Sequence, residues 1–315
     1  MRDVTTFHRE ALARLREEVP HKAIVAASGG IDSTAAALLA QEALGDRCRA
    51  VFVDTGLLRE GEVARVREFF GQSRLEFTVV DAASRFFRTL KDVADPEEKR
   101  RRIGAAFIRL FEEEAASFGA DRLIQGTIAP DWIESGGQLR DTIKTHHNVG
   151  GIPKDSQLKL VEPLRELYKD EVRALAHHLH IPQADRQPFP GPGLAVRVQG
   201  PVTEERVALA RTANAVVEDE VEKAIQAGSM TRPWQYFAVL LSTRTVGVTG
   251  DNRVYGDAVS VRIVESTDAM TATAMAPPPE LLRTISERIT RALSGRVTRV
   301  LYDVTDKPPA TIEWE

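Results

Sequence analysis

Short apolar runs alternate with amphipathic stretches along the first part of the chain. The run AIVAA at 23–27 predicts a buried strand, the alanine- and leucine-rich stretch 33–44 predicts a helix, and RAVFVDT at 49–55 predicts a second strand. A helix near 60–70 and a strand at 75–81 complete a third repeat of this pattern. Strands that alternate with helices at this spacing predict an α/β fold, a doubly wound parallel sheet with helices on both faces.

The same pattern continues to a joint rich in proline and glycine at 189–197. A long helix should begin at Asp95 and Pro96, which suit the N-cap and the first helical position. A strand at 122–127 and a helix at 167–180 follow. We place a boundary after residue 198, between a first domain of residues 1–198 and a second domain of residues 199–315. The second domain reads as a small α+β layer that begins with a helix at 203–227.

One long segment interrupts the pattern. Residues 134–157 contain four glycines and few large apolar side chains. A connection of this length without strong periodicity is uncommon in a compact domain, and it is often a functional lid or a disordered segment.

Composition limits the class of protein. The 315 residues carry 42 Lys and Arg against 46 Asp and Glu, so the net charge is −4, and this mild negative charge argues against a general nucleic-acid binder. The single cysteine, Cys48, excludes an internal disulfide and a cysteine-based zinc site. We find no signal peptide and no apolar run near 18 residues, and we expect a cytoplasmic protein that binds no membrane.

The segment SGGIDST at 28–34 lies between a predicted strand and a predicted helix. Small residues let backbone N–H groups approach an anion, and a helix N-terminus adds partial positive charge. A Walker A loop has a lysine before its Ser/Thr, and this segment has none. Asp32 stands inside it, and because a carboxylate repels phosphate unless a divalent cation bridges them, Asp32 indicates a Mg²⁺ ligand. A plain strand–helix turn is the alternative interpretation.

The pattern SGG-x-DS resembles the pyrophosphate loop of the ATP pyrophosphatases, which cleave ATP between the α and β phosphates and adenylate a carbonyl oxygen of a substrate. Seven further blocks, in order along the chain, resemble the synthetase part of GMP synthetase. These blocks are VFVDTGLLRE (51–60), DPEEKRRRIG (95–104), LIQGTIAPDWIES (123–135), IKTHHNVGGIP (143–153), LVEPLRELYKDEVR (160–173), RQPFPGPGLAVR (186–197) and KPPATIEWE (307–315).

This resemblance implies an ATP site in the first domain. The pyrophosphate would be bound by Ser28, Gly29, Gly30, Asp32 and Ser33, with Asp32 beside Mg²⁺. Phe52, Gly126 and Thr127 would lie beside the rest of ATP, and Lys144 would neutralise charge on the α-phosphate from a mobile loop. From the residues alone, the alternatives are a core strand for the Phe52 region, a tight turn at Gly126 and a solvated lysine at 144.

The resemblance also implies a nucleotide substrate, xanthosine 5′-monophosphate (XMP). The expected substrate-binding residues are Arg100, Arg186, Lys307, Thr311, Ile312 and Glu313. Lys307 suits the phosphate and Glu313 suits the edge of the base. A solvated basic helix face at Arg100, a linker at Arg186 and a frayed tail are the alternatives from the residues alone. In the implied reaction the O2 of XMP attacks the α-phosphate and expels pyrophosphate, then ammonia attacks C2 and AMP leaves.

The source of ammonia is expected to be a separate glutaminase subunit, or free ammonia. A glutaminase of the relevant type needs a cysteine nucleophile in a G-x-C-x-G-like elbow. Cys48 lies in GDRCRAV, at the start of a predicted buried strand, and reads as a packed thiol. The resemblance further implies a homodimer formed through the C-terminal domain.

Two other functions compete with this interpretation. A tRNA-modifying thiolase would be expected to have paired cysteines or a basic surface, and the chain has neither. The intact loop, Lys144 and the complete C-terminal tail together argue against a non-catalytic nucleotide-binding or regulatory protein.

Overall fold

The structure is a computed structural model, and it describes residues 3–72, 75–129, 158–181, 186–267 and 269–315. The chain packs into two compact units. The first unit consists of Met1–Thr55, Gly61–Phe86 and Arg100–Arg186. The second unit consists of Gly56–Glu60, Phe87–Lys99 and Gln187–Glu315.

The first unit alternates helices and strands. Its elements, two of which extend into the second unit, are α1 (Val4–Glu18), β1 (Ala23–Ala27), α2 (Ile31–Leu44), a 3₁₀ turn η1 (Gly45–Arg47), β2 (Cys48–Asp54), α3 (Glu62–Gly71), β3 (Glu76–Asp81), α4 (Ala83–Thr89), α5 (Pro96–Phe118), β4 (Arg122–Ile124), β5 (Lys159–Val161) and α7 (Lys169–His178).

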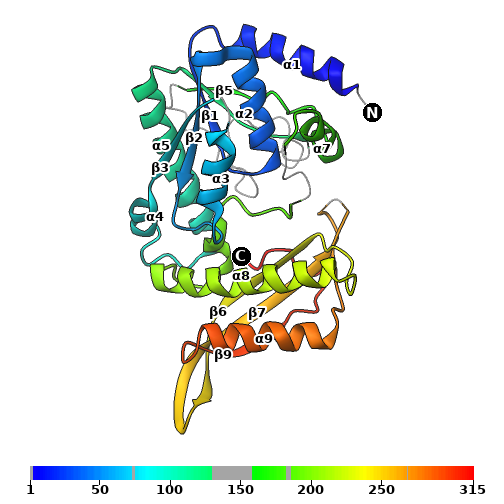
Figure 1. Cartoon of the computed structure of the whole chain (residues 1–315). Coiled ribbons are helices and arrows are strands. Elements are labelled where there is room, and N and C mark those ends of the chain that lie inside the picture. The colour runs from blue at the N-terminus through cyan, green and yellow to red at the C-terminus, as the bar shows by residue number, and fades with distance from the viewer. Residues whose placement is uncertain (1–2, 73–74, 130–157, 182–185, 268) are drawn as a thin grey trace. The chain divides into compact units, whose positions relative to one another are not determined.

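The five strands form one parallel sheet in the order β3-β2-β1-β4-β5. Helices α2 and α5 lie on opposite sides of the strands (Figure 1). The chain passes from β1 outward through β2 to β3, and then returns to β4 on the other side of β1. The loops after β1 and β4 therefore leave the carboxyl edge at the point where the strand order reverses, which is where ligands bind in doubly wound folds.

Burial explains why these segments form a layered core. Strand β1 is almost entirely buried, and so are most alanines and leucines of α2, including the three consecutive residues Ala35, Ala36 and Ala37. Helix α5 begins where the sequence predicts it, because the Asp95 carboxylate accepts a hydrogen bond from the Glu98 N–H at 2.8 Å. Its apolar stripe includes the buried Ile103, Phe111 and Phe118.

The second unit is a helix-covered, mixed sheet. Its elements are η2 (Gly193–Arg197), α8 (Glu204–Gln226), β6 (Gln235–Thr249), β7 (Asn252–Glu265), β8 (Thr273–Ala274), α9 (Pro279–Ala292) and β9 (Val297–Tyr302). Strand β7 pairs antiparallel with β6 and β8, and parallel with β9. Thr203 caps α8, since its Oγ1 accepts the Arg206 N–H at 3.2 Å.

Strands β6 and β7 continue past the helices as a long two-stranded arm (Figure 1). The arm turns at Gly250, whose φ is +57°, between the paired residues Thr249 and Asn252. The arm carries large apolar side chains that are exposed: Val248 is 74% exposed and Tyr255 is 63% exposed. Large exposed apolar side chains that cluster together mark an interaction surface.

The architecture confirms the predicted fold class. Strand β1 has the predicted bounds, and the other predicted strands and helices are present with shifted ends. The strand predicted at 122–127 ends at Ile124, although the Gln125 N–H still donates to the Val161 carbonyl at 3.0 Å. The sequence pattern did not reveal α4 and β8. Among the described residues, no helix is long and apolar enough to cross a membrane.

Candidate functional site

The small-residue loop follows β1 and leads directly into α2. Gly30 is the N-cap, so Asp32 and Ser33 belong to the first turn of the helix. The Ser33 hydroxyl lies 2.9 Å from the Ser28 Oγ and accepts the Ser28 N–H at 3.1 Å. These hydrogen bonds fold the loop around the helix start, where backbone N–H groups and the helix dipole favour an anion.

Two glycines, Gly29 and Gly126, allow the loop to pack closely against its neighbours. Gly29 has a φ of +78°, and a Cβ there would lie 2.8 Å from Val66 Cγ2. A Cβ at Gly126, in the segment after β4, would lie 2.6 Å from both the Asp32 carbonyl carbon and the Ser33 nitrogen. The structure therefore brings the predicted Gly126 against the predicted loop, backbone to backbone, as only glycine permits.

Phe52 and Thr127 lie at the same edge of the sheet. Phe52 pairs in register with Ala27, the last residue of β1, and its side chain is buried. A Cβ on Gly29 would lie 3.9 Å from its ring, so Phe52 packs beneath the loop. Thr127 is also buried and follows Gly126 directly.

A buried carboxylate that the sequence did not single out lies beside the loop. Glu62, at the start of α3, is almost fully buried, and its Oε1 would lie 3.3 Å from a Cβ on Gly29. The predicted Arg186 donates two hydrogen bonds of 2.8 Å to its two carboxylate oxygens, and Arg65 donates a third at 3.1 Å. This charge-assisted cluster fixes Arg186 next to the candidate phosphate loop.

Two further predicted residues belong to the sequence range of this unit, Arg100 and Lys144. Arg100 lies in the first part of α5. Lys144 and the predicted lid at 134–157 lie outside the described residues. In the part of the chain that the structure describes, no group of three or more His, Cys, Asp or Glu side chains could hold a metal ion. Asp32 is nevertheless compatible with Mg²⁺, because this ion commonly takes one or two carboxylates and completes its shell with substrate phosphates and water.

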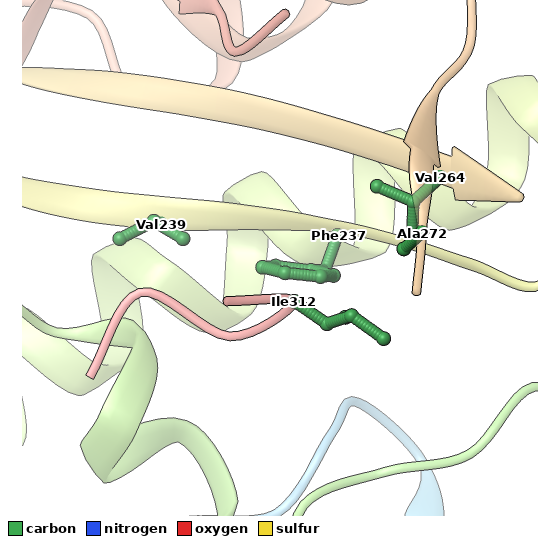
Figure 2. Packing of buried hydrophobic residues seen from close by; sticks show 5 residues of the cluster. All are labelled: Phe237, Val239, Val264, Ala272 and Ile312. Atoms are coloured by element: carbon green, nitrogen blue, oxygen red, sulfur yellow. The ribbon is translucent and has the colours of Figure 1, made fainter. Parts of the chain in front are cut away.

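The C-terminal tail, residues 303–315, holds the other predicted residues and is tied into the second unit. The Lys307 ammonium donates to the Ala269 carbonyl at 2.8 Å. Ile312 is 9% exposed and packs against Phe237, Val239, Val264 and Ala272 (Figure 2). The Ile312 side chain therefore belongs to the core of the second unit.

Two fully buried arginines hold the tail, and neither stood out in the sequence pattern. Arg262 donates to the carbonyls of Thr305, Thr311 and Ile312 and to the Asp303 carboxylate, at 2.8–2.9 Å. Arg197 donates to both carboxylate oxygens of Glu313, at 2.8 and 3.1 Å. Gln235 adds a hydrogen bond to Glu313 at 2.9 Å.

Two carboxylates of the tail, those of Asp303 and Glu313, are paired with buried arginines in this network. Burial acts to raise the pKa of Asp303, but the hydrogen bonds from Thr305, the charge of Arg262 and the indole N–H of Trp314 outweigh it and hold that pKa below its usual value. Trp314 donates to the same carboxylate at 3.0 Å. The tail is thus an ordered part of the unit and does not fray.

Cys48 is a packed thiol, as predicted. It begins β2 and is fully buried, and burial raises the pKa of its thiol to about 12. A thiol with this pKa is protonated at neutral pH and is a poor nucleophile.

Comparison with known proteins finds relatives along nearly the whole chain. The GMP synthase (glutamine-hydrolyzing) B subunit of Thermoplasma acidophilum is 56% identical over 301 residues, which cover 96% of each chain. The B subunit of the Thermococcus kodakarensis enzyme is 58% identical over 316 residues, 98% of this chain and 99% of that protein. GMP synthase (glutamine-hydrolyzing) of Aeropyrum pernix is 54% identical over 296 residues, 93% of this chain and 57% of that protein.

Two further comparisons cover parts of the chain. The family described as GMP synthase C terminal domain matches residues 222–314. Among solved structures, an NH3-dependent NAD synthetase from Campylobacter jejuni aligns with 58% of this chain and 76% of that chain, at 18% identity and a TM-score of 0.46.

The fold and the loop define a doubly wound α/β protein whose candidate ligand site lies at the carboxyl edge of its parallel sheet, at the reversal of strand order. The identities extend over nearly the full length of the B subunits of GMP synthase. The chain therefore belongs to the family of GMP synthase (glutamine-hydrolyzing) B subunits, which is a family of enzymes.

Proposed function

We propose that the chain catalyses the ATP-dependent amination of XMP to GMP, through an adenylyl-XMP intermediate and with release of AMP and pyrophosphate. The observation that carries this proposal is the identity of 56–58% to B subunits of GMP synthase over 96–98% of the chain. The chemistry needs in-line positioning and charge neutralisation more than covalent help from the protein.

The loop after β1 is assigned to ATP. Ser28, Gly29, Gly30 and Ser33 bind the β,γ-pyrophosphate at the start of α2, and Ser33 also holds the loop in shape because its hydroxyl accepts the Ser28 N–H. Mg²⁺, which neutralises phosphate charge when bound with ATP, would be held by Asp32. Lys144 is assigned to the α-phosphate, where an ammonium stabilises the charge that develops in the transition state. Phe52, Gly126 and Thr127 form the wall on which the nucleotide rests.

The tail and two arginines are assigned to XMP. Lys307 retains donors beyond the one given to Ala269 and suits the phosphate. Thr311, Ile312 and Glu313 bind through the backbone and the fixed Glu313 carboxylate. Arg100 and Arg186 complete the set. In functional terms we assign ATP cleavage to residues 1–198, which also supply these two arginines, and we assign dimerisation and the rest of XMP binding to residues 199–315.

Ammonia is proposed to come from a separate glutaminase subunit. The two relatives that this chain covers over 96% and 99% of their length are B subunits, and the relative from Aeropyrum pernix is a longer protein of which this chain covers 57%. In this chain the lone cysteine is buried and protonated, so it is unsuited to attack glutamine.

The arm of β6 and β7 is the surface we propose for homodimer formation. Val246, Val248 and Tyr255 expose apolar area along it, and a second copy of the chain would cover that area.

A steady-state assay of the purified chain with ATP, XMP and either ammonia or glutamine tests the proposal. We expect AMP and pyrophosphate to appear with ammonia and only when XMP is present. Glutamine should support the reaction only after a glutaminase subunit is added. Release of ADP, or ATP cleavage that is independent of XMP, would refute the proposed reaction. Turnover of glutamine by the chain alone would refute the separate subunit.

A further inference from the structure

The end of the tail is anchored by a third buried cation, Lys99. This residue lies in α5 and packs within the second unit. Its ammonium is fully buried and forms an ion pair with the Glu315 carboxylate. It also donates to the carbonyls of Val198 at 2.8 Å and Ala195 at 3.3 Å.

Glu315 is held from a second side as well. Its side chain is 7% exposed, and its Oε1 accepts the Gly200 N–H at 3.1 Å. Glu315 therefore contributes a buried, hydrogen-bonded carboxylate from a segment that has no helix or strand. The anchor lies two residues beyond Glu313, whose carboxylate is fixed by Arg197.

A buried ion pair of this kind is a weak source of stability, because desolvation of the two charges offsets their attraction. A better attested role of a buried ion pair is to select one conformation of the chain among several. Burial of this pair costs free energy, and the pair holds a segment that has no helix or strand. It is therefore suited to fixing the position of that segment before a ligand binds.

We propose that Lys99 and Glu315 are positioning residues for the nucleotide substrate. The pair locks the tail end so that Lys307, Thr311 and Glu313 are already placed when XMP binds. This inference rests on the proposed function, since it takes XMP as the ligand of the tail. Neither Lys99 nor Glu315 needs to touch XMP for this role.

Preorganisation determines the size of the expected effect. Without the pair, XMP itself must order the two or three side chains at the tail end, each at a cost of about 2- to 10-fold in affinity. Lys99→Met and Glu315→Gln should therefore raise the Kd for XMP by about 10- to 100-fold. The KM for ATP should stay within about twofold, because the loop after β1 is untouched.

The test measures XMP binding by calorimetry without ATP, together with kcat, both KM values and amide hydrogen exchange of residues 303–315. Lys99→Met leaves a buried carboxylate without its cation, and Glu315→Gln leaves a buried ammonium that still donates to the carbonyls of Val198 and Ala195, so the two variants remove the pair from opposite sides. The double variant Lys99→Met/Glu315→Leu replaces the charges by apolar groups and should recover part of the lost XMP affinity. Arg288→Met removes an exposed ion pair of the same unit with Asp219 and Glu220, and serves as the control.

Weaker XMP binding and faster exchange of the tail in both single variants, with Arg288→Met unchanged, would support the positioning role. A Kd for XMP within threefold of the parent protein in folded variants would overturn it, even if the melting temperature falls. If the parent protein binds no XMP, the proposed function fails and the positioning role fails with it. Binding by the parent with unchanged variants refutes the positioning role alone.

Discussion

Gly126→Ala should damage the candidate ATP site without removing any group that contacts ATP. The added Cβ would lie 2.6 Å from the Asp32 carbonyl carbon and the Ser33 nitrogen and 2.7 Å from the Asp32 oxygen. Ordinary contacts between such atoms begin at about 3.5 Å, so the first turn of α2 must move by about 1 Å relative to the segment after β4. All three neighbours are backbone atoms, so no side chain can rotate away.

We expect Gly126→Ala to affect the turnover rate more than the stability of the fold. A displacement of this size at a phosphate site lowers kcat by about 10- to 100-fold. Overpacking of this kind lowers the free energy of unfolding by about 1–3 kcal/mol. The assay is XMP- and ammonia-dependent release of pyrophosphate, with thermal unfolding followed in parallel.

Gly71→Ala is the matched control in the same unit. Gly71 ends α3, has no positive φ, and leaves nothing within 4 Å of the place where an alanine Cβ would lie. The control should keep its kcat and its melting temperature. If Gly126→Ala is as active as Gly71→Ala, the loop does not depend on this close backbone contact, and the reasoning from the glycine fails.

Four further changes probe other parts of the molecule. Asp32→Asn should abolish most activity and shift the melting temperature little, because a first-turn carboxylate contributes only about 0.3–1 kcal/mol to its helix; a variant with normal turnover would exclude Asp32 as a Mg²⁺ ligand. Lys144→Ala should lower kcat more than it raises either KM, and an unchanged kcat would make Lys144 a solvated loop residue. The Cys48 thiol is stabilising below its unfolded pKa of about 8.5, and this contribution is lost as the pH rises toward the folded pKa of about 12. Cys48→Ala should therefore flatten the fall of stability above pH 9 in urea titrations, and an unaltered slope would contradict the raised pKa. Val248→Glu combined with Tyr255→Glu should convert a dimer to monomers in sedimentation experiments at unchanged melting temperature, whereas a persistent dimer would exclude the arm as the interface.

Much of the fold could be predicted because its signals are local. The apolar run at 23–27 and the caps at Asp95 and Thr203 each depend on residues within one or two turns of each other, and the structure confirms all three. The short helix α4 and the two-residue strand β8 escaped prediction, because they are too short to show a period.

The residues of the candidate site also fall into two groups: those with a local signal in the sequence and those without one. The loop at 28–33 is visible in the sequence because its small residues are contiguous. Glu62, Arg197 and Arg262 are not visible, because charged residues are rarely buried and each has partners far away in the chain, 124 residues away for Glu62 and Arg186. Ile312 is predicted to contact substrate and this stays a prediction, but the sequence did not reveal that its side chain completes an apolar cluster, because that cluster forms only in the folded sheet.

The ion pair of Lys99 and Glu315 also bears on the order in which the protein is made. The two residues are 216 positions apart. A ribosome that adds about 5–20 residues per second needs about 10–40 s to travel from one to the other. During that interval the tail carboxylate that pairs with the Lys99 ammonium has not yet been made. Closure of the second unit around Lys99 therefore cannot precede synthesis of the tail.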